Sequence, residues 1–205
     1  PDFTLFVDNI NLYPTPPVTS PTQTELTLPI TFEGGSVVTN DFGDIGGGYL
    51  NGNGFDGGLA SVESNTTFTG NPSATVGQII RYDTPSAGSF INLTGDLDFS
   101  VDPTICMKVY TEAPVGTDVI LKMEDPDGGQ PDIFIGSVTT VSGAWETLCF
   151  DFTGAITAYN RMTVLFDFNE TPVNGAPESI FRFDDIEQPT APPAGISLPI
   201  DFEGD

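Results

Sequence analysis

The sequence predicts an all-β protein, a β-sandwich of jelly-roll type. Three observations support this fold class. Short runs of strand-forming residues recur at fairly even spacing along much of the chain. No eleven-residue window keeps a convincing helical period. The 205 residues include 23 glycines and 18 prolines, which implies many turns and few long helices.

The first strand is expected at residues 28–33, and it is followed by a loop over residues 40–58. That loop interleaves glycines with Asn and Asp, and such a stretch does not form a stable strand or helix by itself. The remaining segments are rich in Val, Ile, Phe and Thr and are bounded by turn residues. The strands predicted after the loop are 75–82, 90–93, 105–110, 119–123, 133–141, 145–152, 162–168 and 179–186.

An internal repeat defines the domain organisation. Residues 28–34 (LPITFEG) return at 198–204 (LPIDFEG), with six of the seven positions identical. A second echo lies upstream of each copy, VDNI at 7–10 and FDDI at 183–186, and a Pro-rich stretch follows each echo. We therefore expect one complete module within a tandem array. Its predicted parts are 1–13, the last strand of a preceding repeat; 14–27, a Pro/Thr-rich linker; 28–187, the module; 188–197, a Pro-rich linker; and 198–205, the first strand of the next repeat.

The charge excludes several classes of partner. The chain has 29 acidic against 5 basic residues and no histidine, a formal net charge of −24. Nucleic acid binding needs clustered Lys and Arg, so it is excluded, and anionic membranes and sulfated polysaccharides are disfavoured for the same reason. Divalent cations fit this composition, because carboxylates are the hard oxygen ligands that Ca²⁺ prefers. The alternative is that the acidity serves solubility alone.

Membrane insertion and catalysis are both expected to be absent. No apolar run approaches the 18 residues typical of a membrane-spanning helix. The chain has no histidine that could serve as a catalytic base for Ser86 or Ser89, and no G-x-S-x-G motif occurs. The sequence therefore predicts a protein that is not an enzyme.

The two cysteines, Cys106 and Cys149, lie in apolar stretches that both read as strands. Neighbouring strands of an extracellular domain would allow a disulfide across this separation of 43 residues. The alternative is two buried free thiols. Zinc is disfavoured, since the chain has no His and no further Cys.

A calcium site is expected where the first and last strands of the module meet. Glu33 would there lie near Asp184 and Asp185, and the repeat keeps an oxygen-bearing side chain at each matching position. Neighbouring buried carboxylates repel each other unless a cation lies between them. The alternative is a set of ordinary surface acids. A second candidate is the glycine-rich loop with Asp41, Asp44, Asn53 and Asp56, for which a loop without metal is the alternative.

Glycan binding would require exposed aromatic side chains beside hydrogen-bonding groups. Trp145, the only tryptophan, enters a predicted strand and is expected in the core. Arg81 could donate hydrogen bonds to a sugar or pair with one of the many acids, and the second is more usual. The candidate glycan-binding residues are Tyr49, Tyr82, Arg81 and Tyr110.

Several segments together resemble a known β-sandwich repeat. They are 30–35, 76–81, 107–110, 119–124, 144–148 and 183–186. The sequence is similar to carbohydrate-binding modules of the galactose-binding-like, jelly-roll type. Such modules occur in tandem in secreted surface proteins and β-glucanases of polysaccharide-degrading, gliding bacteria. The resemblance implies a structural Ca²⁺ held by Glu33 and by Asp184 or Asp185, and a β-glucan-like polysaccharide as ligand.

Two functions follow from these observations. The first is a Ca²⁺-stabilised module of a large extracellular cell-surface protein that binds polysaccharide through its concave face. The second is a structural spacer or filament-forming repeat of a giant adhesin without a sugar site of its own. The partners of the second would be neighbouring repeats, or copies that dock head to tail by strand addition.

Overall fold

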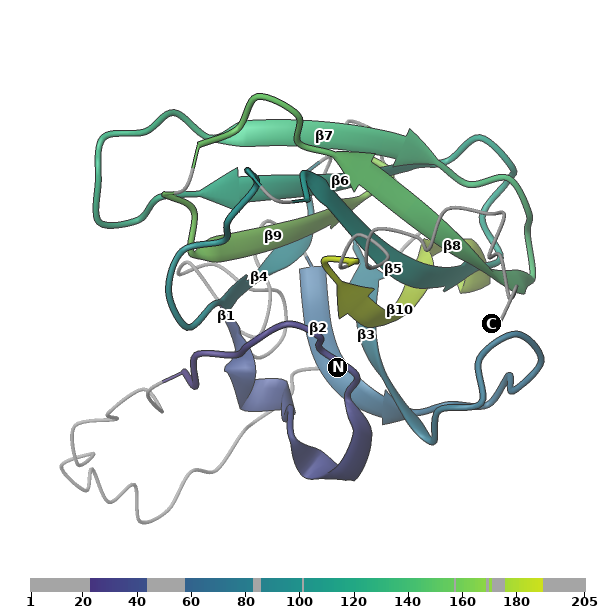
Figure 1. Cartoon of the computed structure of the whole chain (residues 1–205). Coiled ribbons are helices and arrows are strands. Elements are labelled where there is room, and N and C mark those ends of the chain that lie inside the picture. Colours follow the sequence, from purple (N-terminus) through teal and green to yellow (C-terminus); the bar gives the residue numbers. More distant parts are fainter. Residues whose placement is uncertain are drawn as a thin grey trace, which may run out of the picture.

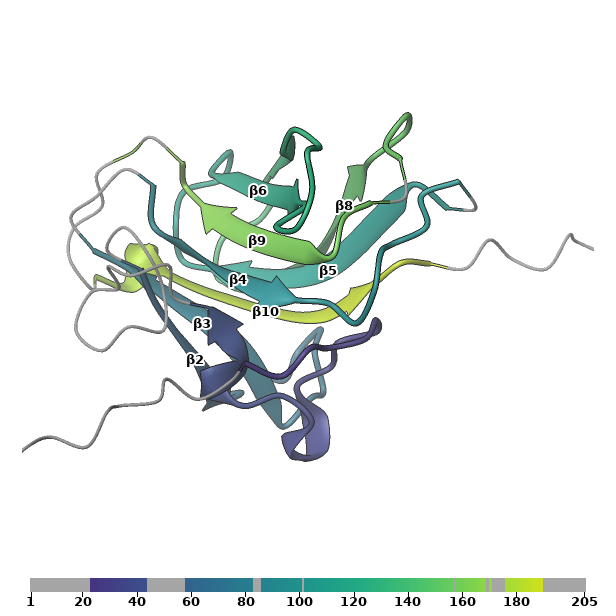
Figure 2. The ribbon, with the colours of Figure 1, turned by 90° about the vertical axis from the view of Figure 1, so that its left-hand side faces the viewer.

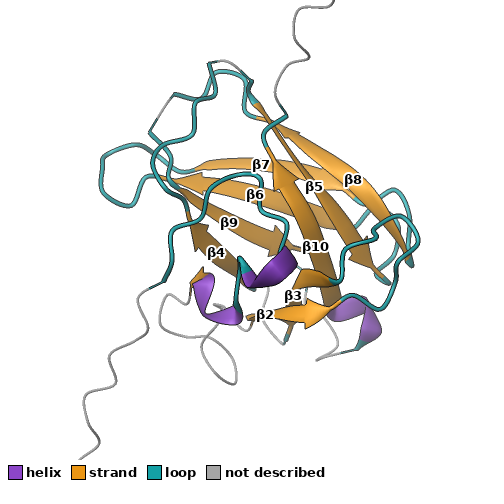
Figure 3. Cartoon of the chain, turned by 60° about the horizontal axis from the view of Figure 1, so that its bottom comes forward, coloured by secondary structure: helices purple, strands orange, loops and turns teal. Residues whose placement is uncertain are grey.

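The chain folds into two five-stranded antiparallel sheets packed face to face, a β-sandwich of jelly-roll type (Figure 1). The computed structural model describes residues 23–43, 58–82, 86–100, 102–156, 158–168, 170 and 176–189. Figure 3 shows how strands dominate these residues and how short the helical turns are. The fold class predicted from the sequence is confirmed. One sheet has the order β1–β4–β9–β6–β7 and the other β2–β3–β10–β5–β8.

The strands are mostly five to eight residues long. Their bounds are β1 Phe42–Gly43, β2 Gly58–Ser64, β3 Thr75–Arg81, β4 Gly88–Asn92, β5 Thr104–Thr111, β6 Asp118–Glu124, β7 Ile133–Val138, β8 Ala144–Asp151, β9 Arg161–Phe166 and β10 Ile180–Glu187. Three 3₁₀ turns accompany them: η1 Glu33–Gly35, η2 Thr39–Asp41 and η3 Pro177–Ser179. Among the described residues, no helix has the length and apolar character needed to cross a bilayer.

The core lies between the two sheets and follows the period-2 pattern of the strands. On β6 the alternate residues Val119, Leu121 and Met123 have no exposed surface, whereas their neighbours are partly exposed. Aromatic rings join the layers: Phe166 of β9 stacks on Phe181 of β10 with ring centroids 4.6 Å apart. Figure 2 shows the layered strands from the side.

The strand predicted at residues 28–33 is not a regular strand. It makes one antiparallel bridge, in which Ile30 and Ile186 exchange both backbone hydrogen bonds at 2.8 and 2.9 Å. The extended backbone then ends, because Phe32 has a φ of 57° and Gly34 a φ of 65°. The expected adjacency of this segment to the last strand is present, but it rests on a single residue pair.

Two strands were missed: β1 lies within the predicted loop over residues 40–58, and β2 begins at its last residue. β1 pairs with β4, and β2 pairs along its whole length with β3. Gly43 of β1 is needed where it is, since a Cβ at that position would lie 2.0 Å from the ring of Phe90. Glycine in β1 therefore signals close packing and not only a loop. The rest of the predicted loop, residues 44–57, lies outside the described residues.

The predicted flanking segments also fall largely outside the described part of the chain. These are the strand at 1–13, most of the linker at 14–27, most of the linker at 188–197 and the strand at 198–205. Within the described part, Leu26 pairs with Leu93 and Gln188 donates hydrogen bonds to the backbone of residues 98 and 102. The ordered packing of the module thus extends slightly beyond 28–187 on both sides.

Cys106 and Cys149 form a disulfide with an S–S distance of 2.08 Å. The two residues face each other in the register of β5 and β8, and their Cα atoms lie 4.1 Å apart. This separation is within the roughly 7 Å that a disulfide can span. The bond covalently joins β8, at the edge of its sheet, to the neighbouring strand.

Candidate functional site

The outer face of the β1–β4–β9–β6–β7 sheet carries two rows of side chains that cross neighbouring strands. Strand register pairs the members of each row directly. Adjacent strands lie about 4.8 Å apart, so a row across four strands is about 14 Å long. We call the two rows together the outer stripe. It consists of Phe90, Thr163, Lys122 and Phe134 in one row and Asn92, Arg161 and Glu124 in the other.

Strand alternation places these side chains on the outside. Ile91, Met162 and Met123, the residues between them on β4, β9 and β6, belong to the buried core cluster. Neighbours along a strand point to opposite faces, so the stripe residues turn away from the core. The alternation of inward and outward side chains on β4, β9 and β6 therefore produces the stripe.

Phe134 gives the stripe its exposed aromatic surface. Its side chain is 52% exposed although it lies on β7, whose register holds it beside Lys122. The Lys122 Nζ atom lies 5.3 Å from the centroid of the Phe134 ring, within the range of a cation–π contact. The Phe134 ring is thus accessible to a ligand, and its contact with Lys122 restrains it.

Lys122 is fixed by two carboxylates. Its Nζ lies 2.8 Å from Asp132 Oδ2 and also contacts Glu124 Oε1. Burial disfavours the charge on Lys122, but hydrogen bonds to Asp132 and Glu124 outweigh this effect and raise its pKa. Glu124 Oε2 in turn accepts a hydrogen bond from Thr163 Oγ1 at 2.5 Å. This part of the stripe is a charged network with a fixed geometry.

Arg161 organises the other end of the stripe. Its guanidinium carbon lies 4.3 Å above the ring of Phe90, which is only 5% exposed. Arg161 Nε donates to Asn92 Oδ1 at 2.8 Å, and Asn92 Nδ2 donates to Gln23 Oε1 at 2.8 Å. The stripe therefore presents one open aromatic ring and a row of oriented polar groups side by side.

Arg81, predicted as a glycan-binding residue, is instead buried between the sheets. Its side chain has no exposed surface, and Nη1 lies 2.8 Å from Asp167 Oδ2 while Nη2 donates to the Glu170 carbonyl. Burial lowers the pKa of Arg81 and raises that of Asp167, although each charge favours the other. Arg81 takes the acid-pairing alternative, and a ligand in solvent cannot reach it.

The predicted tyrosines do not lie on the outer stripe. Tyr110 is on the outer face of the other sheet, with the Arg182 guanidinium carbon 5.4 Å from its ring and the Trp145 ring 5.7 Å away. Tyr82 is half-buried and directly follows β3, and Tyr49 lies outside the described residues. The structure thus does not bring the four predicted glycan-binding residues together on one surface.

Trp145 is buried as expected, but it lies outside the core between the sheets. It is 8% exposed, its Nε1 donates to the Thr67 carbonyl at 2.7 Å, and Gly70 approaches its side chain. The segment 65–74, which joins β2 to β3, therefore covers it on the outer face. This covering segment also makes contacts with two of the predicted metal ligands.

Glu33 and Asp184 both bind the segment 71–75. Glu33 Oε1 accepts hydrogen bonds from the backbone N–H groups of Ala74 and Thr75, at 2.6 and 3.1 Å. Asp184 has no exposed surface, and its Oδ2 accepts from Asn71 Nδ2 at 2.8 Å. Burial raises the pKa of Asp184, and hydrogen bonds from Asn71, Ser73 and the Asp185 N–H oppose this shift without cancelling it.

Asp185, the third predicted ligand, points elsewhere. A φ of 47° and a register shift in β10 turn it toward Lys108, whose Nζ lies 2.7 Å from Asp185 Oδ2. The pair borders a surface cavity of about 400 Å³ lined by Pro29, Thr31, Lys108, Thr147, Asp185 and Glu187. Within the described part of the chain, no three acidic, His or Cys side chains are grouped to hold a metal ion.

The second predicted metal site can be followed only at Asp41. Asp41 Oδ2 accepts from the Val38 N–H at 2.8 Å and Oδ1 from the Thr24 N–H at 3.3 Å, so its carboxylate caps η2. The other members, Asp44, Asn53 and Asp56, lie outside the described residues.

Sequence reasoning missed most of the outer stripe. The polar positions of β6 and the exposed apolar positions of β7 were visible as alternation. Their neighbours across the sheet depend on strand order and register, and β4 and β9 are separated in the chain from each other and from the consecutive strands β6 and β7. The alternation could have identified Lys122, Glu124 and Phe134 as outward-facing residues, but not as members of one stripe with Arg161.

Comparison with known proteins gives structural likeness only. No protein-family model and no curated protein sequence matches the chain. Among solved structures, the family 11 carbohydrate-binding module of the Clostridium thermocellum cellulase Lic26A-Cel5E is 16% identical, with a TM-score of 0.49, over 80% of this chain and 93% of that one.

Two further solved structures contain family 22 modules. The CBM22-1 xylan-binding domain of Paenibacillus barcinonensis Xyn10C is 12% identical, with a TM-score of 0.44, over 77% of this chain and 88% of that one. The CBM22-1–GH10 modules of Clostridium thermocellum xylanase 10B, complexed with xylohexaose, are 15% identical, with a TM-score of 0.49. Here the match covers 77% of this chain but only 27% of the longer one. At such identities the likeness concerns the β-sandwich fold alone.

Proposed function

We propose that this chain is a non-catalytic polysaccharide-binding module of an extracellular protein, and that the outer stripe is its binding surface. The observation that carries the proposal is Phe134, a half-exposed ring on β7, next to polar groups already held in place. Preorganised groups of this kind bind a ligand without a large cost in side-chain entropy.

The chemistry of the stripe suits an uncharged sugar chain. A pyranose has an apolar C–H face that packs on an aromatic ring, and a rim of hydroxyls that donate and accept hydrogen bonds. Lys122 pairs with both Glu124 and Asp132, and Glu124 also lies beside Arg161 in the strand register, so two acids accompany two bases and the stripe offers no surplus of positive charge for a polyanion. A neutral, β-glucan-like polysaccharide lying across the strands is the ligand that we infer.

An extracellular setting is consistent with the disulfide between Cys106 and Cys149, because disulfides persist mainly in oxidising compartments. The repeated heptapeptide at 28–34 and 198–204 supports placement in a tandem array, which we propose is displayed at a cell surface. In such an array each module would add one weak site, and linked sites gain avidity through effective concentration.

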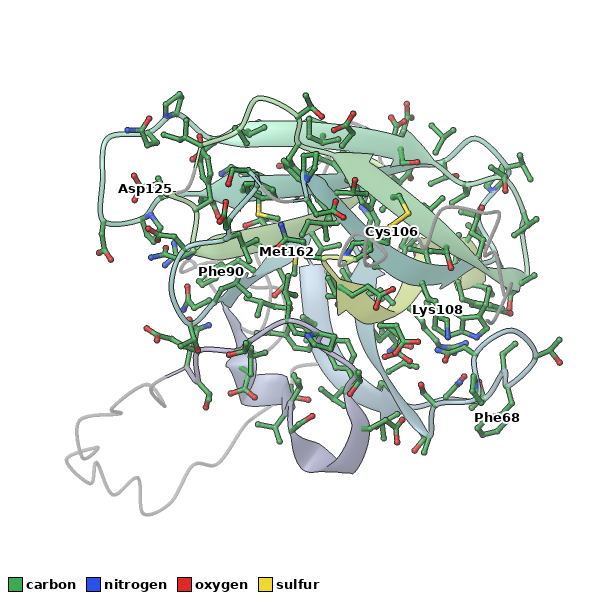
Figure 4. All side chains as sticks on the ribbon, in the orientation of Figure 1. Phe68, Phe90, Cys106, Lys108, Asp125 and Met162 are labelled. Carbon is green, nitrogen blue, oxygen red and sulfur yellow. A yellow bond between two sulfur atoms is a disulfide. The ribbon has the colours of Figure 1, made fainter. Side chains whose placement is uncertain are left out.

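Replacing the exposed ring tests the proposal. Binding of the full chain to soluble neutral polysaccharides, including mixed-linkage β-glucan, β-1,3-glucan and xylan, is measured by calorimetry and affinity electrophoresis. Phe134→Ala should weaken binding about tenfold, since a stacked ring contributes on the order of 1.4 kcal/mol. The matched control is Phe68→Ala, which removes a ring that is 59% exposed at the far end of the molecule from Phe90 (Figure 4).

The control variant should bind as the unchanged protein does. Equal losses in both variants, or full binding by Phe134→Ala, would remove the stripe as the site. Absence of binding to every polysaccharide of the panel would count against the function itself.

We also propose that the module binds a Ca²⁺ ion with Glu33 and Asp184. The two carboxylates supply the hard oxygen ligands that Ca²⁺ prefers, and both reach the segment 71–75, where they accept hydrogen bonds from N–H groups of Asn71, Ala74 and Thr75. When bound, the ion would supply the positive charge that compensates the buried carboxylate of Asp184. Asp185 is not part of this set, because Lys108 neutralises it.

A further inference from the structure

The slot that holds residues 28–34 is well defined. Ile30 and Phe32 are 2% and 1% exposed, and Ile30 exchanges both backbone hydrogen bonds with Ile186. Glu33 accepts from the N–H groups of Ala74 and Thr75. We call the surface that these residues fill the opening slot.

The tightest packing in the opening slot surrounds the Phe32 side chain. The Phe32 ring lies edge-on to Phe183 at 5.5 Å and stacks near Phe42 at 6.1 Å. Gly77 provides the room, since a Cβ there would lie 2.7 Å from Phe32 Cζ. Thr75 Oγ1 also donates to the Phe32 carbonyl at 2.5 Å. The Phe32 ring therefore fills space that Gly77 leaves free.

The repeat at 198–204 keeps each residue on which the slot depends. Ile200, Phe202 and Glu203 match the two buried apolar residues and the carboxylate. The one difference is Asp201 in the place of Thr31, and Thr31 is partly exposed and borders the surface cavity beside Lys108. The identical residues are therefore those that make the buried contacts, and the one substituted position, Thr31, is partly exposed.

We propose that the opening slot also accepts residues 198–204 of a second copy of this chain, so that copies couple head to tail. The backbone of the segment now in the slot makes one bridge and no strand ladder, and its other contacts are side-chain packing and hydrogen bonds, so it can be exchanged without breaking either sheet. A contact between residues 198–204 of one copy and the slot of another copy is heterologous, and such contacts propagate into chains of molecules. This inference does not depend on polysaccharide binding.

The stretch before residue 198 favours a second copy over the same molecule. Residues 188–197 contain Pro189, Pro192 and Pro193, and Pro-rich linkers favour an extended conformation of about 3.1 Å per residue. Ten such residues span about 30 Å, whereas a return to Ile186 would require this stretch to reverse direction. An extended linker would present residues 198–204 to a neighbour.

Competition from residues 28–34 keeps exchange rare in the unchanged protein. A segment tethered to its own slot acts at an effective concentration near the millimolar range, far above a micromolar protein solution. The experiment therefore weakens the resident segment with Phe32→Asp in the full chain and compares it with Phe202→Asp and with the double variant. Oligomer size is measured by light scattering after size-exclusion chromatography, and thermal midpoints are measured in parallel.

The proposal predicts a coupling between two residues that are far apart in the sequence. Phe202→Asp alone should leave both the size and the Tm unchanged. Phe32→Asp alone should form oligomers that grow with concentration, and adding Phe202→Asp should abolish them and lower the Tm by about 10 °C. Phe68→Asp, an exposed ring elsewhere, should have no effect in either background.

Two outcomes would overturn the proposal. One is a monomeric Phe32→Asp variant, whether or not Phe202→Asp destabilises it, because the occupant would then be absent or would come from the same molecule. The other is a failed peptide rescue, which is tested if Phe32→Asp unfolds. A synthetic peptide of residues 196–205 in excess must then restore its thermal transition, while the same peptide carrying Phe202→Asp must not; failure to restore rejects the slot as the binding site.

Discussion

Asp184 is a residue whose environment opposes its own charge. It has no exposed surface, and burial raises its pKa above the ordinary value even though Asn71, Ser73 and the Asp185 N–H donate to it. A carboxyl group with a raised pKa binds protons more tightly in the folded than in the unfolded state. Its contribution to folding stability is therefore greatest at low pH and is lost as the pH rises through the folded-state pKa. Asp167 has the same direction of shift, from burial.

This sign leads to a test of pH dependence in the presence of a chelator. The thermal midpoint should be higher near pH 4, the ordinary range of an Asp carboxyl, than at pH 7, because the raised pKa makes the folded state hold the Asp184 proton more tightly than the unfolded chain does. Asp184→Asn should reduce the difference, since an amide does not titrate. An Asp184→Asn variant with the same pH profile as the unchanged protein would show that Asp184 makes no contribution to it.

Ca²⁺ bound at Asp184 should raise the thermal midpoint at neutral pH, where the ionised carboxylate otherwise lowers it. Ligand bound only to the folded state at a hundredfold excess over Kd adds about 2.7 kcal/mol, which corresponds to a Tm rise of about 5–10 °C for a chain of this size. Calorimetry with CaCl₂ and with EDTA at pH 7 measures this shift. Asp184→Asn should lose it, and the control Asp185→Asn should keep it, because Asp185 pairs with Lys108. No shift in the unchanged protein would reject the ion.

At the scale of single elements, β8 depends on its disulfide. It forms the edge of its sheet, pairs only with β5 there, and is bonded to it by Cys106–Cys149. A bond that closes 43 residues removes conformational entropy from the unfolded chain worth about 4 kcal/mol in the chain-entropy model. The bond therefore opposes the detachment of an edge strand whose remaining contacts to β5 are hydrogen bonds and packing.

Removing the disulfide should lower the free energy of unfolding by about 2–4 kcal/mol without changing the fold. Urea denaturation of Cys106→Ala/Cys149→Ala, with far-ultraviolet circular dichroism to check the sheet content, measures the change. The unchanged protein under reducing conditions is the control and should lose a similar amount. A loss below about 0.5 kcal/mol in both would mean that β8 is held by its other contacts.

The elements also show how far sequence could predict this fold. Runs such as 119–123 and 145–152 alternate clearly, and each overlaps an observed strand, β6 and β8. The run at 28–33 looked equally extended, yet its backbone turns at Phe32 with a φ of 57°. β2 was hidden by the neighbouring glycines and by the polar ending of its own sequence, and it is held mainly by pairing with β3. Tertiary pairing outweighed local propensity in both cases.

The candidate site was less predictable than the elements. Asp184 and Glu33 could be associated in advance because the repeat marked both ends of the module. Arg81 could not be placed, since a charged residue on a predicted strand gives no indication of whether it faces solvent or Asp167 across the core. The outer stripe depends on the register between strands distant in sequence, and register is a property of the folded sheets.

For the whole molecule, acidic residues greatly outnumber basic residues. All five basic residues are described: Lys122 and Arg161 lie on the outer stripe, Lys108 and Arg182 on the outer face of the other sheet, and Arg81 between the sheets. With 29 acids against 5 bases, at least 24 carboxylates have no basic residue to neutralise them. Folding brings these like charges closer together, so self-repulsion opposes the compact state.

This repulsion makes salt dependence a test of the whole molecule. Isolated salt bridges are weakened by added salt, whereas net repulsion is relieved by it, and here the excess of acids makes relief the larger effect. In EDTA at pH 7, raising NaCl from about 10 to 200 mM shortens the Debye length from about 30 to below 10 Å. The Tm should therefore rise, by about 2–4 °C for each kcal/mol of repulsion that is screened. KCl should act equally, which separates ionic strength from specific sodium binding. A falling Tm would mean that the few ion pairs, among them Lys122 with Glu124 and Asp132, contribute more to stability than the surplus of acids removes.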